Sequence, residues 1–338
     1  MFKIKFYQIL ILTVVINLFY GCNNDDPVVE EEFEFPSKVI NRIIVDSNGS
    51  KWFATEKGVV SYDGLKWTSY TDEQNKTTGS ISDIVFDRLS GIKKLWVGTK
   101  AGLSSFEIET SAITTDNFNT SKDEILSDTV SALGVDDVNV KYIGTSKGLS
   151  ILKGDKWDKF YGRQNEEILA EYKISSIAVS QNGYIYAATK GGGISRFKYA
   201  DAISGATTFN LPWASGLPSE TVYSAVADGN AQWYGTDKGV AYHSSELTKS
   251  DWTTYTREDG LVCDTVYAIA KDPSGNVWFG THKGVSKLSG NKWQSYTVKD
   301  GLIANKINTI AIDLDHSVWF GSDQGISHFT VDGKWVNF

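Results

Sequence analysis

The stretch Asp272-Pro273-Ser274-Gly275-Asn276-Val277-Trp278-Phe279-Gly280-Thr281-His282-Lys283-Gly284 contains the pattern from which the fold follows. Its Pro-Ser-Gly segment predicts a tight turn. Its second half has the order aromatic, variable, small, Thr, two variable residues, Gly. The Thr-x-x-Gly end predicts a second hairpin, where Gly takes a left-handed conformation that a side chain would strain. The stretch therefore predicts one β-strand between two hairpin turns.

This motif recurs seven times along the chain. The copies lie at 52–58, 96–102, 142–148, 186–193 (with one inserted residue), 233–239, 278–284 and 319–325 (with Ser322 in place of Thr). Successive copies are 44, 46, 44, 47, 45 and 41 residues apart. A period of ~40–50 residues is typical of the four-stranded blades of a β-propeller.

Each period divides into four short strands, which we name a to d from the inside outward. Strand a is apolar and is followed by Asp in six copies, strand b carries the aromatic residue, and strand c follows the Thr-x-x-Gly turn. Strand d has a second Trp in five copies, at Trp67, Trp157, Trp252, Trp293 and Trp335. Residues 36–338 then give seven blades of about 43 residues. We predict an all-β protein, a single seven-bladed β-propeller of four-stranded antiparallel blades, whose first and last blades meet without exchanging a strand.

The first 21 residues are expected to be a signal peptide. Lys3 and Lys5 precede a mostly apolar run, 6–20, which is too short for a spanning helix of ~20 residues. The run ends in Gly21-Cys22, which resembles a bacterial lipobox, so Cys22 is the predicted lipid attachment site. The alternative is an ordinary signal peptide with an incidental Cys.

Residues 22–35 form a predicted tether with six acidic and no basic residues. This stretch resembles the export signals of surface lipoproteins in Bacteroidetes-type bacteria. We expect a lipid-anchored protein of the cell envelope, at the periplasmic or the outer face of the outer membrane, with the lipid as its only membrane attachment. Without leader and tether, 35 of 41 acidic and 31 of 33 basic residues remain, a net charge of −4, which predicts no nucleic-acid partner.

Residues 36–338 resemble the two-component regulator propellers, whose repeats read close to Asp-x-x-Gly-x-x-Trp-x-Gly-Thr-x-x-Gly-Leu. The family's Gly-Leu loop has counterparts at 216–217, 260–261 and 301–302. The resemblance implies an extracytoplasmic sensor region, in a family that often responds to polysaccharide fragments and also includes lipoproteins and secretion-associated proteins. The usual sensor has further propeller, a β-sandwich, a membrane helix and a kinase, which this sequence does not contain, so kinase activity is not implied.

Catalysis, cofactors and metals find little support in the sequence. Gly-x-Ser occurs in four blades where strand c begins, whereas a nucleophile would occupy a single strand-to-helix turn. The Asp residues after the a strands are interpreted as hairpin caps, with calcium ligation as the less favoured alternative. Virginiamycin lyases, which are similar seven-bladed propellers using His and Mg²⁺, provide the alternative function, and His282 is the one His expected in a b–c turn.

The predicted ligand-binding face carries the b–c turns and the loops between blades. Lysines occupy six of its b–c turns: Lys57, Lys100, Lys147, Lys190, Lys238 and Lys283. Because acidic residues leave the face near −3, solvated turn lysines are favoured over a ring that binds an anionic polymer. The remaining candidates are Trp213, which fits no repeat position, and Tyr161 and Arg163, which lie in the loop before blade 4 and are expected to join it. We expect a monomeric, non-catalytic binding or sensor module for a carbohydrate or an envelope protein, with a structural role in a secretion assembly as a further alternative.

Overall fold

The computed structural model describes residues 33–71, 80–88, 94–108, 115–161, 169, 171, 173–199, 209–211, 216–229, 231–244 and 252–338. The chain divides into two units, Met1–Glu34 and Phe35–Phe338, and the second unit is the propeller. The predicted signal peptide, Cys22 and all of the tether except its last residues, 33–35, lie outside the described residues. No helix in the described ranges is long and apolar enough to cross a membrane.

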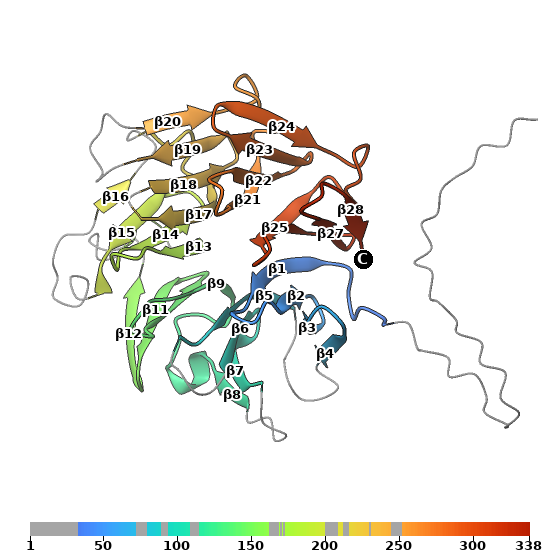
Figure 1. Cartoon of the computed structure of the whole chain (residues 1–338). Coiled ribbons are helices and arrows are strands. Elements are labelled where there is room, and N and C mark those ends of the chain that lie inside the picture. Colours follow the sequence, from blue (N-terminus) through green and yellow to red (C-terminus); the bar gives the residue numbers. More distant parts are fainter. Residues whose placement is uncertain are drawn as a thin grey trace, which may run out of the picture. The chain divides into compact units, whose positions relative to one another are not determined.

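Seven four-stranded antiparallel sheets surround a central axis (Figure 1). Blade 1 consists of β1 (Ile40–Val45), β2 (Lys51–Thr55), β3 (Gly58–Tyr62) and β4 (Trp67–Thr71). Blade 2 consists of β5 (Ile81–Phe86), β6 (Lys94–Thr99), β7 (Gly102–Glu107) and β8 (Thr115–Phe118). A short 3-10 helix, η2 (Thr120–Lys122), leads to blade 3, which consists of β9 (Val130–Val135), β10 (Lys141–Thr145), β11 (Gly148–Lys153) and β12 (Lys156–Tyr161). Blade 4 consists of β13 (Ile174–Val179), β14 (Ile185–Thr189), β15 (Ile194–Phe197) and β16 (Phe209–Leu211).

The last three blades follow the same order. Blade 5 consists of β17 (Val222–Asp228), β18 (Ala231–Thr236), β19 (Val240–His243) and β20 (Trp252–Tyr255). Blade 6 consists of β21 (Val266–Lys271), β22 (Val277–Thr281), β23 (Val285–Ser289) and β24 (Lys292–Tyr296). Blade 7 consists of β25 (Ile307–Ile312), β26 (Val318–Ser322), β27 (Ile326–Phe329) and β28 (Trp335–Asn337). The predicted seven-bladed fold is confirmed, and every blade is built from consecutive strands, so none is shared between blades 1 and 7.

The Thr-x-x-Gly motif forms the predicted b–c hairpin. In blade 6 the buried Thr281 hydroxyl donates to the Gly284 carbonyl at 2.8 Å and accepts from the Lys283 backbone N–H at 3.0 Å. Gly284 has φ +138°, and a Cβ there would lie 2.3 Å from the Tyr296 carbonyl oxygen. The same Thr or Ser hydroxyl bond closes the b–c turn in every blade. The motif therefore stabilises the b–c turn of each blade.

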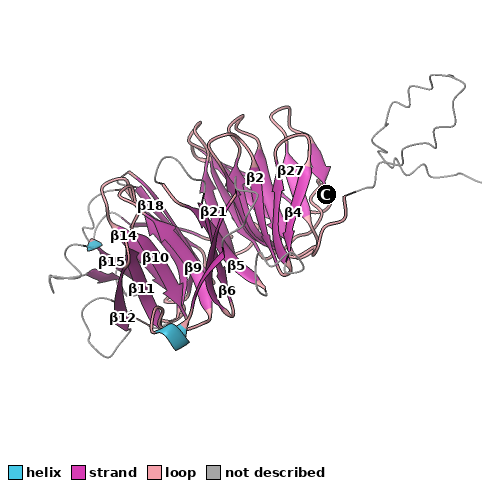
Figure 2. Ribbon diagram, turned by 90° about the horizontal axis from the view of Figure 1, so that it is seen from below, coloured by secondary structure: helices cyan, strands magenta, loops and turns pink. Residues whose placement is uncertain are grey.

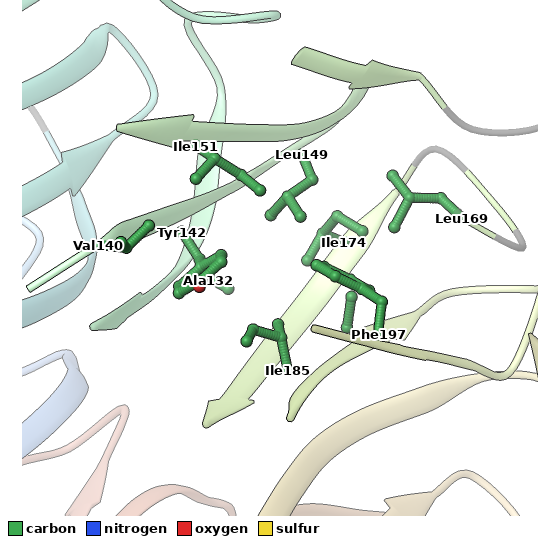
Figure 3. Close-up of a cluster of buried hydrophobic side chains, with 10 residues drawn as sticks. Ala132, Val140, Tyr142, Leu149, Ile151, Leu169, Ile174, Ile185 and Phe197 are labelled. Atoms are coloured by element: carbon green, nitrogen blue, oxygen red, sulfur yellow. The ribbon is translucent and has the colours of Figure 1, made fainter. Parts of the chain in front are cut away.

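The hydrophobic core lies between neighbouring blades because each sheet buries both of its faces. Figure 3 shows one such cluster, in which side chains of blade 3, including Tyr142 and Ile151, meet Ile174 and Ile185 of blade 4. The small residue of the motif allows neighbouring blades to pack closely, since a Cβ on Gly144 would lie 2.4 Å from Ile174 Cγ2. The b-strand Trp residues lie in equivalent positions, as predicted, and Trp278 is 2% exposed among residues of blades 6 and 7.

The a–b turns lie on the opposite face from the b–c turns (Figure 2). In blade 1 the Asp46 carboxylate accepts from the Asn48 backbone N–H at 2.8 Å and from the Trp52 indole N–H at 3.0 Å. The corresponding carboxylates of blades 2, 6 and 7 also accept from the indole of their own b strand. These aspartates cap hairpins as predicted, and no cluster of three metal-ligating side chains occurs among the residues that the structure describes.

Candidate functional site

Each innermost strand contains an irregularity at its second residue, where one residue is left out of the pairing with strand b. Such β-bulges redirect a side chain and often occur near functional sites. The bulged residues are Asn41, Ser82, Ser131, Ser175, Tyr223, Tyr267 and Asn308. Since all seven line one cavity of about 210 Å³, they surround the central channel at the end that carries the b–c turns. We call these seven residues the mouth belt.

Five members of the mouth belt link one blade to the next through hydrogen bonds. Each donates to the backbone carbonyl of the first residue of the following inner strand. The bonds are Asn41 to Ile81 at 2.7 Å, Ser82 to Val130, Ser131 to Ile174 and Ser175 to Val222 at 2.5 Å each, and Asn308 to Ile40 at 3.2 Å. The last of these joins blade 7 to blade 1, so the belt contributes to ring closure.

Tyr223 and Tyr267, the members of the mouth belt in blades 5 and 6, interrupt this series of hydrogen bonds. Their half-buried rings meet edge to face, with centroids 5.1 Å apart. The Tyr267 hydroxyl lies 3.5 Å from Nδ1 of His282, in the adjacent b–c turn. Among the described residues neither tyrosine bonds to the next blade, unlike the serines and asparagines, and the Tyr267 hydroxyl contacts His282 of its own blade instead.

The two tyrosines have charged neighbours on the same face. The Lys190 ammonium lies 5.7 Å from the Tyr223 ring centroid, and the Lys306 ammonium lies 5.9 Å from that of Tyr267. Lys306 also pairs with Asp323 at 2.7 Å, which balances its charge. Burial, helped by nearby negative groups, raises the pKa of the Tyr223 phenol, which therefore stays protonated and can donate a hydrogen bond at neutral pH.

Deeper in the channel, Arg42 of β1 pairs with Asp83 of β5. The Arg42 Nε lies 3.2 Å from the Asp83 carboxylate, which also accepts from the Leu133 backbone N–H at 2.8 Å. Burial raises the pKa of Asp83, and the Arg42 guanidinium opposes that rise. The side chain of Arg42 remains 48% exposed, and Arg42 lines the channel.

The residues predicted for ligand binding do not border this cavity wherever the structure describes them. Lys57, Lys147, Lys238 and Lys283 are exposed in the b–c turns, as predicted from the motif, and none lines the channel. Tyr161 ends β12, but its side chain is not described, and Arg163 and Trp213 lie outside the described residues. Their roles remain predictions.

The mouth tyrosines were not among the residues that the sequence singled out. The available signal was that Tyr223 and Tyr267 occupy the second position of strand a, where the other blades have Ser or Asn. Only the bulge, which pattern alone does not reveal, turns that position toward the axis. The histidines lie as expected, with His243 and His328 on strand c, His316 in an a–b turn and His282 near the mouth.

Comparison with known proteins supports the predicted resemblance. The profile of the two component regulator propeller family matches residues 260–283, which include the a–b turn and strand b of blade 6. The sequence has no significant match among curated proteins. The resemblance to this family is therefore confirmed over one repeat, in blade 6.

Solved structures share the propeller fold at low sequence identity. The extracellular domain assigned to a hybrid two component system of B. thetaiotaomicron is 21% identical, with a TM-score of 0.72 over 88% of this chain and 40% of that chain. Streptogramin B lyase is 13% identical, with a TM-score of 0.67 over 90% of this chain and 96% of that chain. PorZ, a surface component of the type-IX secretion system of Porphyromonas gingivalis, is 16% identical, with a TM-score of 0.66 over 86% and 46%. This chain spans less than half of the first and third of these proteins.

Proposed function

We propose that this chain is an extracytoplasmic binding or sensor module without catalytic activity, anchored to the outer membrane through a lipid on Cys22. It presents the channel mouth to a carbohydrate or to another envelope protein. The observation that carries the proposal is the Tyr223–Tyr267 pair. In the other five blades the side chain at this position forms a hydrogen bond to the next blade, whereas blades 5 and 6 have two half-buried rings there. Partly exposed aromatic surface beside hydrogen-bonding groups is typical of recognition sites.

The comparisons are consistent with this proposal in two respects. The B. thetaiotaomicron structure that shares the fold is an extracellular domain of a regulatory system, and PorZ is a surface component of a secretion system. A binding module of the cell envelope agrees with both. PorZ also keeps open the alternative that this chain is a structural part of an envelope assembly.

The second candidate function is a lyase, favoured by the likeness to streptogramin B lyase and by the position of His282 beside Tyr267 at the mouth. A general acid or base must come within hydrogen-bond reach of its substrate. His282 is exposed and contacts the Tyr267 hydroxyl only at 3.5 Å. A binding role requires no such group, and we prefer it for that reason.

One experiment separates these functions. The full chain, purified in mild detergent, is tested for retention of immobilised glycans and of proteins from an outer-membrane extract, and the recovered ligand is analysed by mass spectrometry. We expect retention of an unaltered ligand. Recovery of a cleaved or eliminated product that disappears with His282→Ala would instead establish the lyase function.

A further inference from the structure

A second cavity, of about 690 Å³, lies between blades 2 and 3 and is lined by none of the mouth-belt residues. Its lining includes Val138 and Asn139 of the a–b turn of blade 3, and Gly154 and Asp155 of the c–d turn. Both turns belong to the face opposite the b–c turns (Figure 2). The volume lies within the range of ~300–1,000 Å³ that is typical of ligand sites. This cavity is therefore a candidate binding site separate from the channel mouth.

The interface between blades 7 and 1 is built like the interface between blades 2 and 3, and it shows what fills the corresponding space. Each interface has a Phe ring between two indoles, with centroids 5.4 to 5.8 Å apart. The rings are Trp319, Phe338 and Trp67 at blades 7 and 1, and Trp96, Phe118 and Trp157 at blades 2 and 3. They occupy equivalent positions in the strand register. The two interfaces can therefore be compared residue by residue.

The first difference lies at the last residue of a c strand. In blade 1 this residue is Tyr62, whose ring stacks on Trp67 at 4.4 Å. In blade 3 the equivalent residue is Leu152, which pairs with Trp157 in the same register and lines the cavity. Leucine has no ring, so within the part of the chain that the structure describes nothing stacks on Trp157 as Tyr62 stacks on Trp67. The cavity lies where that ring is missing.

The second difference concerns the other indole. At blades 7 and 1 the imidazole of His328 stacks on Trp319 at 4.0 Å. The equivalent of His328 in blade 2 is Ser105, which is too short to cover Trp96. Two ammonium groups lie over the Trp96 ring instead, at 5.3 and 5.2 Å from its centroid, and they belong to Lys94 and Lys141. Trp96 is thus covered by cations, and Trp157 is the indole left open to a ligand.

The described lining of the cavity has a net charge of −2, from four carboxylates and two ammonium groups. Two of the carboxylates are neutralised in ion pairs, Lys94–Asp116 at 2.8 Å and Lys141–Asp87 at 3.0 Å. The other two, Glu124 and Asp155, form no ion pair with any residue that the structure describes. In the corresponding turn of blade 1 the position of Asp155 is occupied by Leu65, so this acidic group is not part of the repeat. The site therefore favours a cation.

We propose that this cavity binds an arginine side chain from a basic segment of a partner protein, with the guanidinium stacked on Trp157 and paired with Glu124 and Asp155. A guanidinium is planar and weakly hydrated, so it can stack on an indole and pair with a carboxylate at the same time. The cavity is larger than one side chain, so the residues that flank the arginine enter it as well. This favours a protein segment over a free guanidine. The site lies apart from the channel mouth and does not depend on the ligand bound there.

Two variants test the site in different ways. Leu152→Tyr introduces the ring that blade 1 has at this position, and it should fill the cavity without lowering the melting temperature. The double variant Glu124→Gln with Asp155→Asn removes the two unpaired charges and keeps the shape of the site. Its matched control is the double variant Glu56→Gln with Glu258→Gln, which removes two exposed carboxylates from the opposite face.

The probes are labelled, blocked peptides of Gly and Ser that differ only in their central residue. Arginine is compared with citrulline, which is planar but uncharged, and with lysine, which is charged but not planar. Fluorescence anisotropy measures their binding to the full chain in mild detergent, and agmatine serves as the free guanidine. We expect the Arg peptide to bind most tightly, the citrulline peptide at least about tenfold more weakly, and the Lys peptide at least about threefold more weakly.

Leu152→Tyr and the double variant of Glu124 and Asp155 should each weaken binding of the Arg peptide at least about tenfold, and the control less than about twofold. No binding of the Arg peptide, equal binding of the citrulline or Lys peptide, or tighter binding of agmatine would overturn the inference. Full affinity in the double variant would also overturn it. If Leu152→Tyr does not fold, the double variant and its control decide the question without it.

Discussion

The ring of Trp67, on the outer strand of blade 1, lies 5.4 Å from the ring of Phe338, the last residue of the chain. Phe338 also exchanges two backbone hydrogen bonds with Ile326, at 2.9 and 3.0 Å. On its other side it stacks on Trp319 of blade 7 at 5.8 Å, and Phe35 contacts Trp67 at 4.7 Å. No strand is shared between blades 1 and 7. The ring is therefore closed by contacts between these blades, which include this aromatic cluster and the Asn308–Ile40 hydrogen bond of the mouth belt.

Phe338→Ala is therefore expected to destabilise the propeller by ~1–3 kcal/mol, less than a fully buried Phe because the side chain is 38% exposed. The control is Val336→Ala in β28, two residues earlier and 40% exposed, which should cost less than ~0.5 kcal/mol. Chemical denaturation of both variants measures the difference. If both variants lose the same free energy of unfolding, the loss in Phe338→Ala depends on the exposure of the side chain and not on its contact with Trp67.

Trp278→Ala should cost ~3–5 kcal/mol, because the indole is buried between blades 6 and 7 and leaves a cavity when truncated. The indole N–H also bonds to Asp272 at 3.2 Å, so truncation removes one of the hydrogen bonds of that buried carboxylate. Leu65→Ala, 96% exposed in a c–d turn, is the control and should change the melting temperature little. An unaltered melting temperature in the Trp278 variant would contradict the assignment of strand b to the core.

The blade architecture was predictable because it repeats. Seven copies of Trp or Tyr before Thr-x-x-Gly, with one inserted residue in the fourth copy and Ser for Thr in the seventh, define strand b. The turn geometry of Thr281 and Gly284 follows from local chemistry alone. The d-strand Trp residues were also predictable, but only the structure shows what their indoles contact. The Gly residues of the Gly-Leu loop pack on them, and a Cβ on Gly260 would lie 2.5 Å from the Trp293 ring.

The channel mouth was not predictable to the same degree. Asn41, Ser82 and Tyr223 lie near the start of apolar strands, and simple alternation does not show that a one-residue bulge turns them to the axis. The lysines of the b–c turns stood out because they repeat, although repetition reflects the turn rather than a ligand. Asymmetry between blades is the better signal, and Tyr223 and Tyr267 are where the belt is asymmetric.

His328 should make stability depend on pH. Its ring stacks on Trp319 at 4.0 Å and its Nε2 lies 2.8 Å from the Ser317 hydroxyl. Burial lowers the pKa of His328 below its usual 6.5; the Asp315 and Asp313 carboxylates oppose this shift, and Lys51 adds a smaller lowering effect. The folded state therefore binds this proton less readily than the unfolded chain, and the stability from neutral His328 is lost as the pH falls through 6.5 and below.

The measurement is the melting temperature of the wild type and of His328→Gln between about pH 7.5 and pH 5.5, a window in which His is the main titrating side chain. The wild type should lose more stability than the variant over this range. His282→Gln, at an exposed position, should behave like the wild type. Parallel curves for wild type and His328→Gln would contradict the assigned pKa direction.

The lipid anchor is tested by Cys22→Ala. Since the apolar leader ends at Gly21-Cys22 and an acidic tether follows, removal of the thiol should prevent lipidation and move the protein from the membrane to the soluble fraction. The control is Cys263→Ala, because Cys263 is buried in the propeller and should not affect fractionation. A Cys22 variant that stays with the membrane at high salt would contradict the lipoprotein prediction.

Trp213 provides the last prediction. Trp213 lies outside the described residues; in the sequence it stands between β16 and β17, and β17 carries Tyr223. We predict that its indole borders the ligand site, since an indole offers a large apolar surface at little entropic cost. We expect Trp213→Ala to weaken ligand binding by at least ~1 kcal/mol with an unchanged melting temperature.

The matched control for Trp213 is Trp252→Ala. The Trp252 indole packs between blades 4 and 5, close enough to Gly216 that a Cβ there would lie 2.3 Å from its ring. Truncation of Trp252 should lower the melting temperature while the folded protein keeps its affinity, because the indole supports the loop without facing the channel. If Trp213→Ala gives the same result as Trp252→Ala, with stability lost and affinity kept, then Trp213 is a core residue of blade 4 and the ligand site ends at the mouth belt.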